Sequence, residues 1–284
     1  MKVTASWTIR KIKHKFKPAL VAAVGSLPDS VQDVMFDPKV RRLVDRIPIL
    51  RAVYTGCFRA HPIDQQLGTD TSGIIIVDPR DEFEAIGTEQ FPYMGSQPSI
   101  VRRALQALGD IHGYTFADIG CGKGRPMIVA SEFPFEAILG YDICAPLVAI
   151  ARRNAEIVAR RFPDRKPIKV IEADATNLAL FPRKLVIFLF NPFGVAPLSA
   201  LLRRLENGLA QGEIEHLFIV YYYPTCADVL DASLALDRCF ERLFHYDPSE
   251  LGYGSEDTQS VVIWQSRQGY RHIPQNANPD GSTP

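Results

Sequence analysis

The sequence of 284 residues lacks the patterns of a disulfide-stapled, zinc-binding or membrane-spanning protein. It holds only five cysteines, an odd number, and no two of them form C-x-x-C. This usage favours a reducing compartment and argues against both a disulfide framework and a structural zinc site. No apolar run approaches the length that spans a bilayer. Ala19–Val24 follows a basic stretch but is short and lacks a convincing cleavage site. We therefore expect a cytoplasmic protein, with a signal peptide as the alternative.

The chain also lacks a net charge, so the whole molecule has no field that would steer it toward nucleic acid. The charges are nevertheless unevenly spread. Residues 1–60 carry twelve Lys and Arg against four Asp and Glu, whereas the remainder carries 20 against 28. Much of the basic excess lies in RKIKHKFK at Arg10–Lys17. This stretch fits either a solvated, frayed helix end or a patch that contacts an anionic surface of lipid, RNA or acidic protein.

Proline and glycine divide the chain into three regions. Residues 1–95 read as an N-terminal helical cap with a short strand at Ile74–Val77, because prolines interrupt the first 60 residues repeatedly. Residues 96–270 show regular hydrophobic periodicity and form the main domain. Residues 271–284 are rich in Pro, Asn, Gly and Ser and read as a disordered tail.

The main domain begins with a helix capped by Ser96 and then alternates between strands and helices. Several strands are near-continuous apolar runs, as in LVIFLF and LFIVYYY, which is typical of a parallel sheet covered by helices on both faces. The expected strands are Tyr114–Ile119, Ala137–Tyr141, Ile168–Glu172, Leu185–Phe190, His216–Tyr223, Phe240–Tyr246 and Ser260–Gln265. The expected helices between them cover residues 123–133, 145–162, 176–181, 196–210 and 226–236. The last two strands, joined without a helix, predict an antiparallel hairpin.

A polar residue lies at or just after the end of each of the first four expected strands. These are Asp118, Asp142, Asp174 and Asn191, and Asp142 comes 24 residues after Asp118. Ligands bind at the carboxyl ends of strands in an open parallel sheet, so we expect all four side chains to face one crevice. A single strand-end Asp equally well caps a helix, but four in register favour a binding site.

The first of these strands leads into a glycine loop, YTFADIGCGKGR, with glycine at 120, 122 and 124. Dinucleotide-binding loops follow G-x-G-x-x-G, and here Arg125 occupies the position of the third glycine. The pattern D-x-G-x-G-x-G resembles motif I of the class I S-adenosylmethionine (SAM)-dependent methyltransferases. YDI, EADAT, FNPFG and the upstream HPIDQQLGTDTSG are similar to segments of a bacterial group within that superfamily, over roughly residues 60–265.

The resemblance implies a Rossmann-like α/β fold: a seven-stranded, mostly parallel sheet with a terminal antiparallel hairpin and helices on both faces. It also implies SAM as the cofactor. The acid after the second strand would accept the ribose hydroxyls, an assignment that NAD-binding folds share. The first acid would order the loop and the methionine end, and the third acid with the next backbone N–H would read adenine. The implied cofactor-binding residues are Asp118, Gly120, Gly122, Asp142, Asp174, Ala175 and Tyr93.

The methyl acceptor is expected to face Asn191 and Phe193. In amino-methyltransferases an N-P-P-aromatic loop holds a planar amine, whereas this chain has N-P-F-G, which argues against nucleobase or glutamine methylation. The alternative is that the segment only makes the turn after the fourth strand. A loose likeness to lysine methyltransferases places Tyr93 over the methionine end and Asp70, Thr71 and Ser72 on the acceptor side. Tyr221–Tyr223 reads as either an aromatic wall or core.

These patterns predict a SAM-dependent methyltransferase that transfers a methyl group in line to an unidentified acceptor. We lean to an amine nitrogen, on a protein or small molecule rather than a nucleic acid, because the bulk charge is neutral. An aligned donor needs no base unless the nucleophile must lose a proton, and none of the six histidines has a recognisable partner. Two alternatives stay open: an NAD(P)-dependent oxidoreductase, and a SAM-binding docking module without activity.

Overall fold

The computed structural model describes residues 60–73, 93–177, 182–250 and 258–267. The basic stretch Arg10–Lys17, the expected strand at Ile74–Val77 and the expected tail at 271–284 lie outside these residues. Within the described part, no helix is both long and apolar enough to cross a membrane, and no three His, Cys, Asp or Glu side chains gather as metal ligands do.

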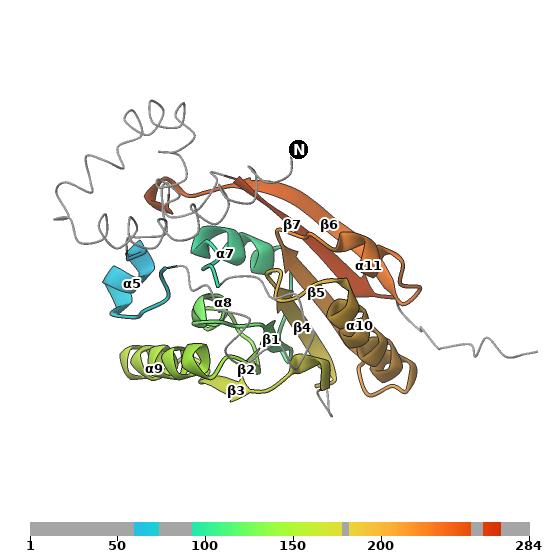
Figure 1. Cartoon of the computed structure of the whole chain (residues 1–284), viewed down its shortest axis with the longest axis horizontal. Helices are drawn as coiled ribbons and strands as arrows, with labels where there is room; N and C mark the ends of the chain where they lie inside the picture. The colour runs from blue at the N-terminus through green and yellow to red at the C-terminus, as the bar shows by residue number, and fades with distance from the viewer. Residues whose placement is uncertain (1–59, 74–92, 178–181, 251–257, 268–284) are drawn as a thin grey trace, which may run out of the picture.

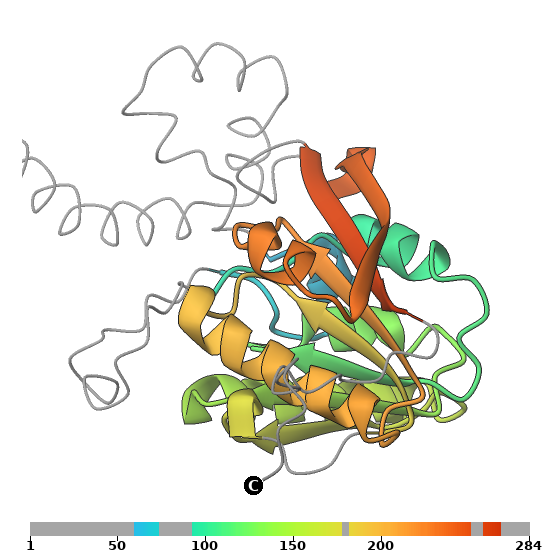
Figure 2. The same ribbon diagram turned by 90° about the vertical axis from the view of Figure 1, so that its right-hand side faces the viewer.

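A seven-stranded sheet forms the centre of the described structure (Figure 1). Its strand order is β3-β2-β1-β4-β5-β7-β6, with β1 to β5 parallel and β7 antiparallel to both of its neighbours. The strands are β1 (Thr115–Ile119), β2 (Ala137–Asp142), β3 (Ile168–Glu172), β4 (Lys184–Leu189), β5 (His216–Tyr222), β6 (Leu236–His245) and β7 (Thr258–Ser266). This is the Rossmann-like seven-stranded fold with a terminal hairpin that the sequence predicts, and Figure 2 shows that hairpin extending past the parallel strands.

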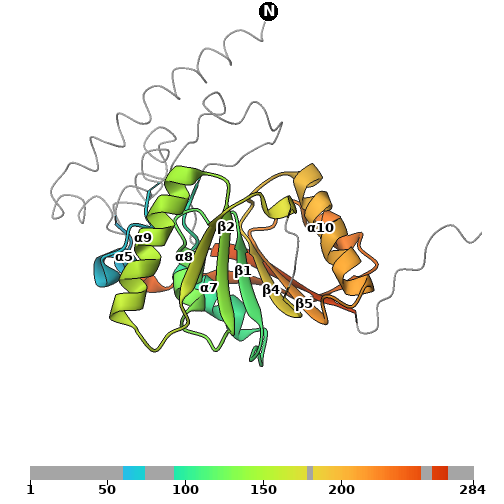
Figure 3. The ribbon, with the colours of Figure 1, turned by 90° about the horizontal axis from the view of Figure 1, so that it is seen from below.

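Helices cover both faces of the sheet (Figure 3). They are α5 (Pro62–Leu67), α7 (Pro98–Gln106), α8 (Arg125–Ala130), α9 (Ala145–Arg161), α10 (Val195–Ala210) and α11 (Ala227–Asp231), with the 3₁₀ helices η1 (Ala175–Asn177) and η2 (Pro248–Glu250). Alternate residues of each strand point to opposite faces. Phe116, Val186 and Val220 therefore pack with α7, α8 and α9 in one core, whereas Ile119 and Ile187 pack with α10 in a second.

Most expected elements are present, and the boundaries shift for local reasons. The helix expected from residue 123 begins only at Arg125, because Gly124 before it is left-handed. Gln97, not Ser96, is the cap residue of α7, and it makes no side-chain capping bond. Ile100, Val101, Ala104 and Leu105 form the buried face of α7.

The largest error concerns the segment before the hairpin. The helix expected over 226–236 ends at Asp231, and β6 begins at Leu236 rather than Phe240. β6 lies at the edge of the sheet and exposes most of its side chains, so its ten residues lack an apolar run. Its pairing partner is β7, with Leu236 opposite Ser266, and that long-range contact leaves no local pattern in the sequence.

Candidate functional site

A cavity of about 650 Å³ lies at the carboxyl ends of β1 to β5. Its wall is built from the loops that follow these strands, from the first turns of α8, α9 and α10, and from residues 93–96 before α7. The cavity brings together nine of the residues that the sequence predicts for the site, namely Asp118, Gly120, Gly122, Asp142, Asp174, Ala175, Tyr93, Asn191 and Phe193. Their roles remain predictions, but their common location at one end of a parallel sheet is where such folds bind ligands.

The glycine loop is closed by bonds to the neighbouring strand. The N–H groups of Gly120 and Cys121 both donate to the carbonyl oxygen of Tyr141, at 2.8 and 3.0 Å. The N–H of Gly122 donates to Asp142 Oδ2 at 2.8 Å. Three successive donors of the loop are therefore already paired within the protein, and they are not presented together to an anionic ligand.

Both glycines also permit close packing. A Cβ on Gly120 would lie 2.4 Å from the Cβ of Pro192, and a Cβ on Gly122 would lie 2.3 Å from the ring of Tyr93. Their φ angles of +71° and +52° add a second reason for glycine. The loop is thus wedged between the segment after β4 and the aromatic ring at residue 93, which fixes two walls of the cavity.

Asp118 is the most unusual side chain of the site. It is only 2% exposed, and its Oδ2 has no hydrogen-bond partner among the described residues. Burial, and to a lesser extent the nearby Asp142, raises the pKa of the Asp118 carboxyl well above its usual range. Buried polar atoms are normally paired, so an unpaired carboxyl oxygen on a buried residue of the cavity wall is unusual and singles out Asp118 within the site.

Asp142 and Asp174 end the next two strands in different environments. Asp142 Oδ1 accepts from the N–H of Cys144 at 2.9 Å, so this carboxylate joins the glycine loop to α9. Burial raises the pKa of Asp142 despite these bonds. Asp174 is exposed, and its Oδ1 accepts from the N–H and hydroxyl of Thr176. It therefore caps η1, while Ala175 is buried at the start of that short helix.

Asn191 holds the loop after β4 to the loop after β5. Its Oδ1 accepts from the hydroxyls of Tyr221 (2.9 Å) and Thr225 (2.7 Å), and from the N–H of Thr225 at 3.3 Å. Its Nδ2 donates to the carbonyl oxygen of Tyr223 at 2.7 Å. Three donors occupy the side-chain oxygen, so the structure favours a bracket between two loops over a direct acceptor of a substrate amine.

The three consecutive tyrosines divide between core and cavity. Tyr221 and Tyr222 are each 1% exposed, and neither ring lines the cavity. Tyr223 lines the cavity and is 41% exposed. Both interpretations of this run are thus partly right, because strand alternation and the end of β5 separate the three rings. Phe193 lies at the cavity as expected and also packs against the core on the α10 side.

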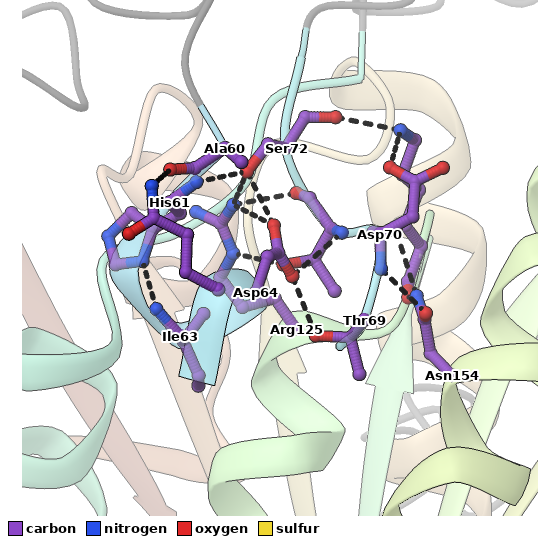
Figure 4. Close-up of polar contacts among 12 residues, drawn as sticks. Ala60, His61, Ile63, Asp64, Thr69, Asp70, Ser72, Arg125 and Asn154 are labelled. Carbon is purple, nitrogen blue, oxygen red and sulfur yellow. Dashed lines mark hydrogen bonds and ion pairs between the residues drawn. The ribbon is translucent and has the colours of Figure 1, made fainter. Parts of the chain in front are cut away.

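None of residues 61–73 lines the cavity, and polar contacts join this segment to Arg125 and Asn154 (Figure 4). Asp70, Thr71 and Ser72 do not line the cavity, so their expected place on the acceptor side is wrong. Lys123 Nζ donates to Asp70 Oδ1 and to the carbonyl oxygen of Ser72, both at 2.7 Å. Asn154 on α9 exchanges two bonds with the backbone of Asp70. We call this segment the strap.

Arg125 is the main anchor of the strap, and sequence reasoning missed this role. Its Nε donates to Thr71 Oγ1 at 2.8 Å, its Nη2 donates to the carbonyl oxygen of Thr71 at 2.7 Å, and Nη1 donates to the carbonyl oxygen of Ser96. Asp64 Oδ2 lies 3.8 Å from Nη2, with both side chains 3% exposed. The one available signal was an arginine where a dinucleotide loop has glycine.

The strap also positions Tyr93. The Tyr93 hydroxyl donates to the carbonyl oxygen of Thr71 at 2.7 Å, which Arg125 also contacts. Burial raises the pKa of the Tyr93 phenol, so the ring is neutral. His61 in the strap is a structural histidine, with Nε2 at 3.0 Å from Gln97 Oε1. Burial and the nearby Arg125 lower the pKa of His61 to about 4.

The comparisons with known proteins concern the fold. No protein-family model matches the chain, and no curated protein matches it. Similar solved structures include magnesium protoporphyrin IX methyltransferase from Synechocystis PCC 6803 with bound SAM, at 15% identity and TM-score 0.43, over 60% of this chain and 77% of that chain. A ribosomal protein L11 methylase from Lactobacillus delbrueckii subsp. bulgaricus shows 15% identity and TM-score 0.41, over 62% and 81%. TrmN from Thermus thermophilus shows 16% identity and TM-score 0.42, over 60% and 49%.

Proposed function

We propose that the cavity binds S-adenosylmethionine and that the protein is a SAM-dependent methyltransferase. The observation that carries this proposal is the charge of the cavity wall. Asp118, Asp142 and Asp174 line it, and the one cation among the described lining residues is Arg125. The guanidinium of Arg125 is committed to the strap, so no lining cation pairs with the three carboxyl groups of the cavity. A ligand with a sulfonium and an ammonium group matches that charge.

The same geometry disfavours the oxidoreductase alternative. A pyrophosphate is bound by free backbone N–H groups at the start of a helix. Here Gly120, Cys121 and Gly122 donate to Tyr141 and Asp142 instead. A dianionic pyrophosphate would also lie beside the buried Asp118, which already lacks a compensating charge among the described residues.

The arrangement supports a definite placement of the ligand. Asp142 would accept the ribose hydroxyls with the lone pairs that its two N–H partners leave free, and Asp174 with the N–H of Ala175 would meet the adenine edge. Asp118 would face the methionine end, next to Gly120 and Gly122. Tyr93 would cover that end from the strap side, while Asn191 and Phe193 would stand on the acceptor side, with Asn191 fixing the loop.

Bound SAM supplies an activated methyl group on a positively charged sulfur. The chain's task is then to align the acceptor with that methyl group and to exclude water. Pro192 packs closely against Gly120 and Tyr93 packs closely against Gly122, and these contacts hold the glycine loop in place. The acceptor we favour is an amine nitrogen of a protein or small molecule, because a neutral nitrogen can attack without prior loss of a proton.

Isothermal titration calorimetry with SAM, S-adenosylhomocysteine (SAH) and NADH tests the proposal on the full chain. We expect SAM and SAH to bind and NADH not to bind. Asp142→Asn should weaken SAM binding by about 1–3 kcal/mol, the usual cost of stranding buried polar partners. Asp164→Asn is the control, because this exposed aspartate lies away from the cavity. Tight NADH binding without SAM binding would overturn the proposal.

Activity is tested separately from binding. Incubation of the full chain with methyl-labelled SAM and cell lysate should transfer label to an acceptor, and the same incubation with the Asp142→Asn variant should transfer less. Persistent absence of transfer despite SAM binding would instead support a docking module that binds SAM without using it.

A further inference from the structure

Two strained residues meet at one side of the cavity. Asn191 (φ 45°) and Tyr223 (φ 51°) are the two residues other than glycine with positive φ in the described part of the chain. Both line the cavity, and Asn191 Nδ2 donates directly to the carbonyl oxygen of Tyr223. A positive φ raises the conformational energy of a bulky residue. Such strain is found at binding sites, where the surrounding structure enforces it.

The backbone of Tyr223 is held on both sides. Its N–H donates to the carbonyl oxygen of Ser260 on β7 at 2.8 Å, and its carbonyl oxygen accepts from Asn191 at 2.7 Å. Asn191 is in turn fixed by Tyr221 and Thr225 through its own oxygen. These bonds keep the ring of Tyr223 at the cavity, 41% exposed, instead of letting it continue the alternation of β5.

The part of the wall around Tyr223 carries no charge. The described lining residues in the loops after β4 and β5 are Phe190, Asn191, Pro192, Phe193, Tyr223 and Thr225, and α10 adds Ala196, Pro197 and Ala200. None of these is Asp, Glu, His, Lys or Arg, and the three lining carboxyl groups lie near the carboxyl ends of β1, β2 and β3. Phe190 adds a second ring, packed edge-on against Tyr222 with ring centroids 4.6 Å apart. One cavity therefore has an acidic half and an uncharged aromatic half.

We propose that the uncharged half is an acceptor subsite for a neutral, planar group that stacks on Tyr223. This inference rests on the proposed function, which places SAM in the acidic half. A charged acceptor would lose its hydration in this half without gaining an ion pair from the described wall, whereas a flat neutral group gains ring contacts. Tyr223 is the specificity-determining residue, and Asn191 is a positioning residue that acts through it.

The chemistry of the subsite follows from the side chains that are there. The described wall of this half offers no carboxylate or imidazole base, so the acceptor must attack as a neutral nitrogen with its own lone pair. The new N–C bond forms as the C–S bond breaks, and the electron pair of that bond stays on sulfur. The methylated nitrogen carries the positive charge and then releases its proton to water.

Four small probes separate charge from planarity on the SAH-saturated full chain. Benzamide is neutral and planar, benzoate and benzamidine have nearly the same shape with opposite charges, and cyclohexanecarboxamide is neutral but not planar. Calorimetric or saturation-transfer NMR titration should show benzamide binding about tenfold or more tightly than each of the others. Tyr223→Leu should weaken benzamide about three- to tenfold, the worth of one aromatic contact, while Tyr223→Phe retains its affinity.

The readouts distinguish the subsite from general damage. SAH affinity and thermal midpoint are measured on the same samples, and Leu234→Ala, at an exposed leucine outside the cavity, serves as the surface control. Benzoate or benzamidine binding as tightly as benzamide, no binding of any probe to SAH-loaded protein, or equal effects of Tyr223→Leu and Tyr223→Phe would each overturn the subsite alone. If the unaltered chain binds no SAH, that result refutes the proposed function and also the subsite, which rests on it.

Discussion

At the scale of single residues, Asp118 connects stability with binding. The carboxylate is buried next to Asp142 and lacks a partner for one oxygen among the described residues. In the ligand-free protein the charged form of this carboxyl is poorly solvated and poorly compensated, which is why its pKa is raised. A buried, partly unpaired carboxyl group is tolerated at a strand end when a bound ligand supplies its missing partner. Such a residue lowers the stability of the ligand-free protein and contributes to ligand binding.

Replacing this charge should separate the two effects. Asp118→Asn keeps the shape but cannot ionise, so we expect the unfolding free energy of the ligand-free protein to rise at pH values where the aspartate is charged, by about 1–2 kcal/mol, within the range found for burying an unpaired polar group. SAM affinity should fall about tenfold, because the amide cannot balance a cationic ligand. Urea unfolding and calorimetry measure the two quantities, and a variant that is both less stable and equally able to bind would contradict this account.

The raised pKa of Asp118 also predicts a direction for pH dependence. An acid whose pKa is higher in the folded state contributes stability that is full below its ordinary pKa and is lost as pH rises through the folded value. The ligand-free protein should thus become less stable as pH increases through that range, and the Asp118→Asn variant should show a smaller slope. Denaturation midpoints across a pH series check this, and identical slopes for the two proteins would refute it.

At this scale the sequence predicts where the site residues lie, but it does not predict their hydrogen-bond partners. Asp118, Asp142, Asp174 and Asn191 were placed at one edge of the sheet, because apolar strands followed by polar residues are a local pattern. Their partners come from distant segments: Asn191 meets Tyr221 and Thr225 at the end of the next strand. The spacing of residues in the sequence does not show which side-chain oxygens already accept hydrogen bonds within the protein.

At the scale of elements, the glycine loop and the strap act as one unit. Tyr93 packs against Gly122 and donates to Thr71, and Arg125 holds the same carbonyl oxygen of Thr71. A substitution in the glycine loop should therefore displace the ring of Tyr93. The strands were readable from apolar runs, whereas the strap was assigned to the wrong side because its contacts span 50 residues or more.

Two glycines allow a matched test of this unit. Gly122→Ala places a Cβ 2.3 Å from the ring of Tyr93, while Gly212→Ala, at φ +74°, meets nothing within 4 Å. Both variants should lose about 1–2 kcal/mol to left-handed strain, but only Gly122→Ala should also weaken SAM binding, by about tenfold or more. Thermal unfolding and calorimetry check the pair. Unchanged SAM affinity in Gly122→Ala would show that the ring does not define the cavity.

At the scale of the whole molecule, the described residues form one sheet with a core on each face, and the strap belongs to that body. The predicted division at residue 95 remains a proposal for the chain as a whole. Residues 61–73 are nevertheless fastened to the main domain by Lys123, Arg125 and Asn154. A boundary drawn from proline content alone does not register polar contacts between segments that are distant in the sequence.

The strap's share of global stability can be measured through its anchor. Arg125→Met leaves Asp64 and two carbonyl oxygens buried without their cation, which should cost about 3–5 kcal/mol, as for other broken buried pairs. Arg102→Met removes a partly exposed ion pair with Glu132 and should cost no more than about 1 kcal/mol. Urea unfolding of both variants measures the two losses of unfolding free energy. Equal losses would mean that Arg125 does not anchor the fold.

The central claim is that the acidic half of the cavity holds the adenosine and methionine of SAM. A crystal structure of the full chain with SAH tests it most directly. We predict the ribose hydroxyls within hydrogen-bonding distance of Asp142, the adenine at Asp174 and Ala175, and the amino group of the ligand on the side of Asp118. SAH bound elsewhere, or bound in this cavity with its ribose away from Asp142 and its amino group away from Asp118, would contradict the claim.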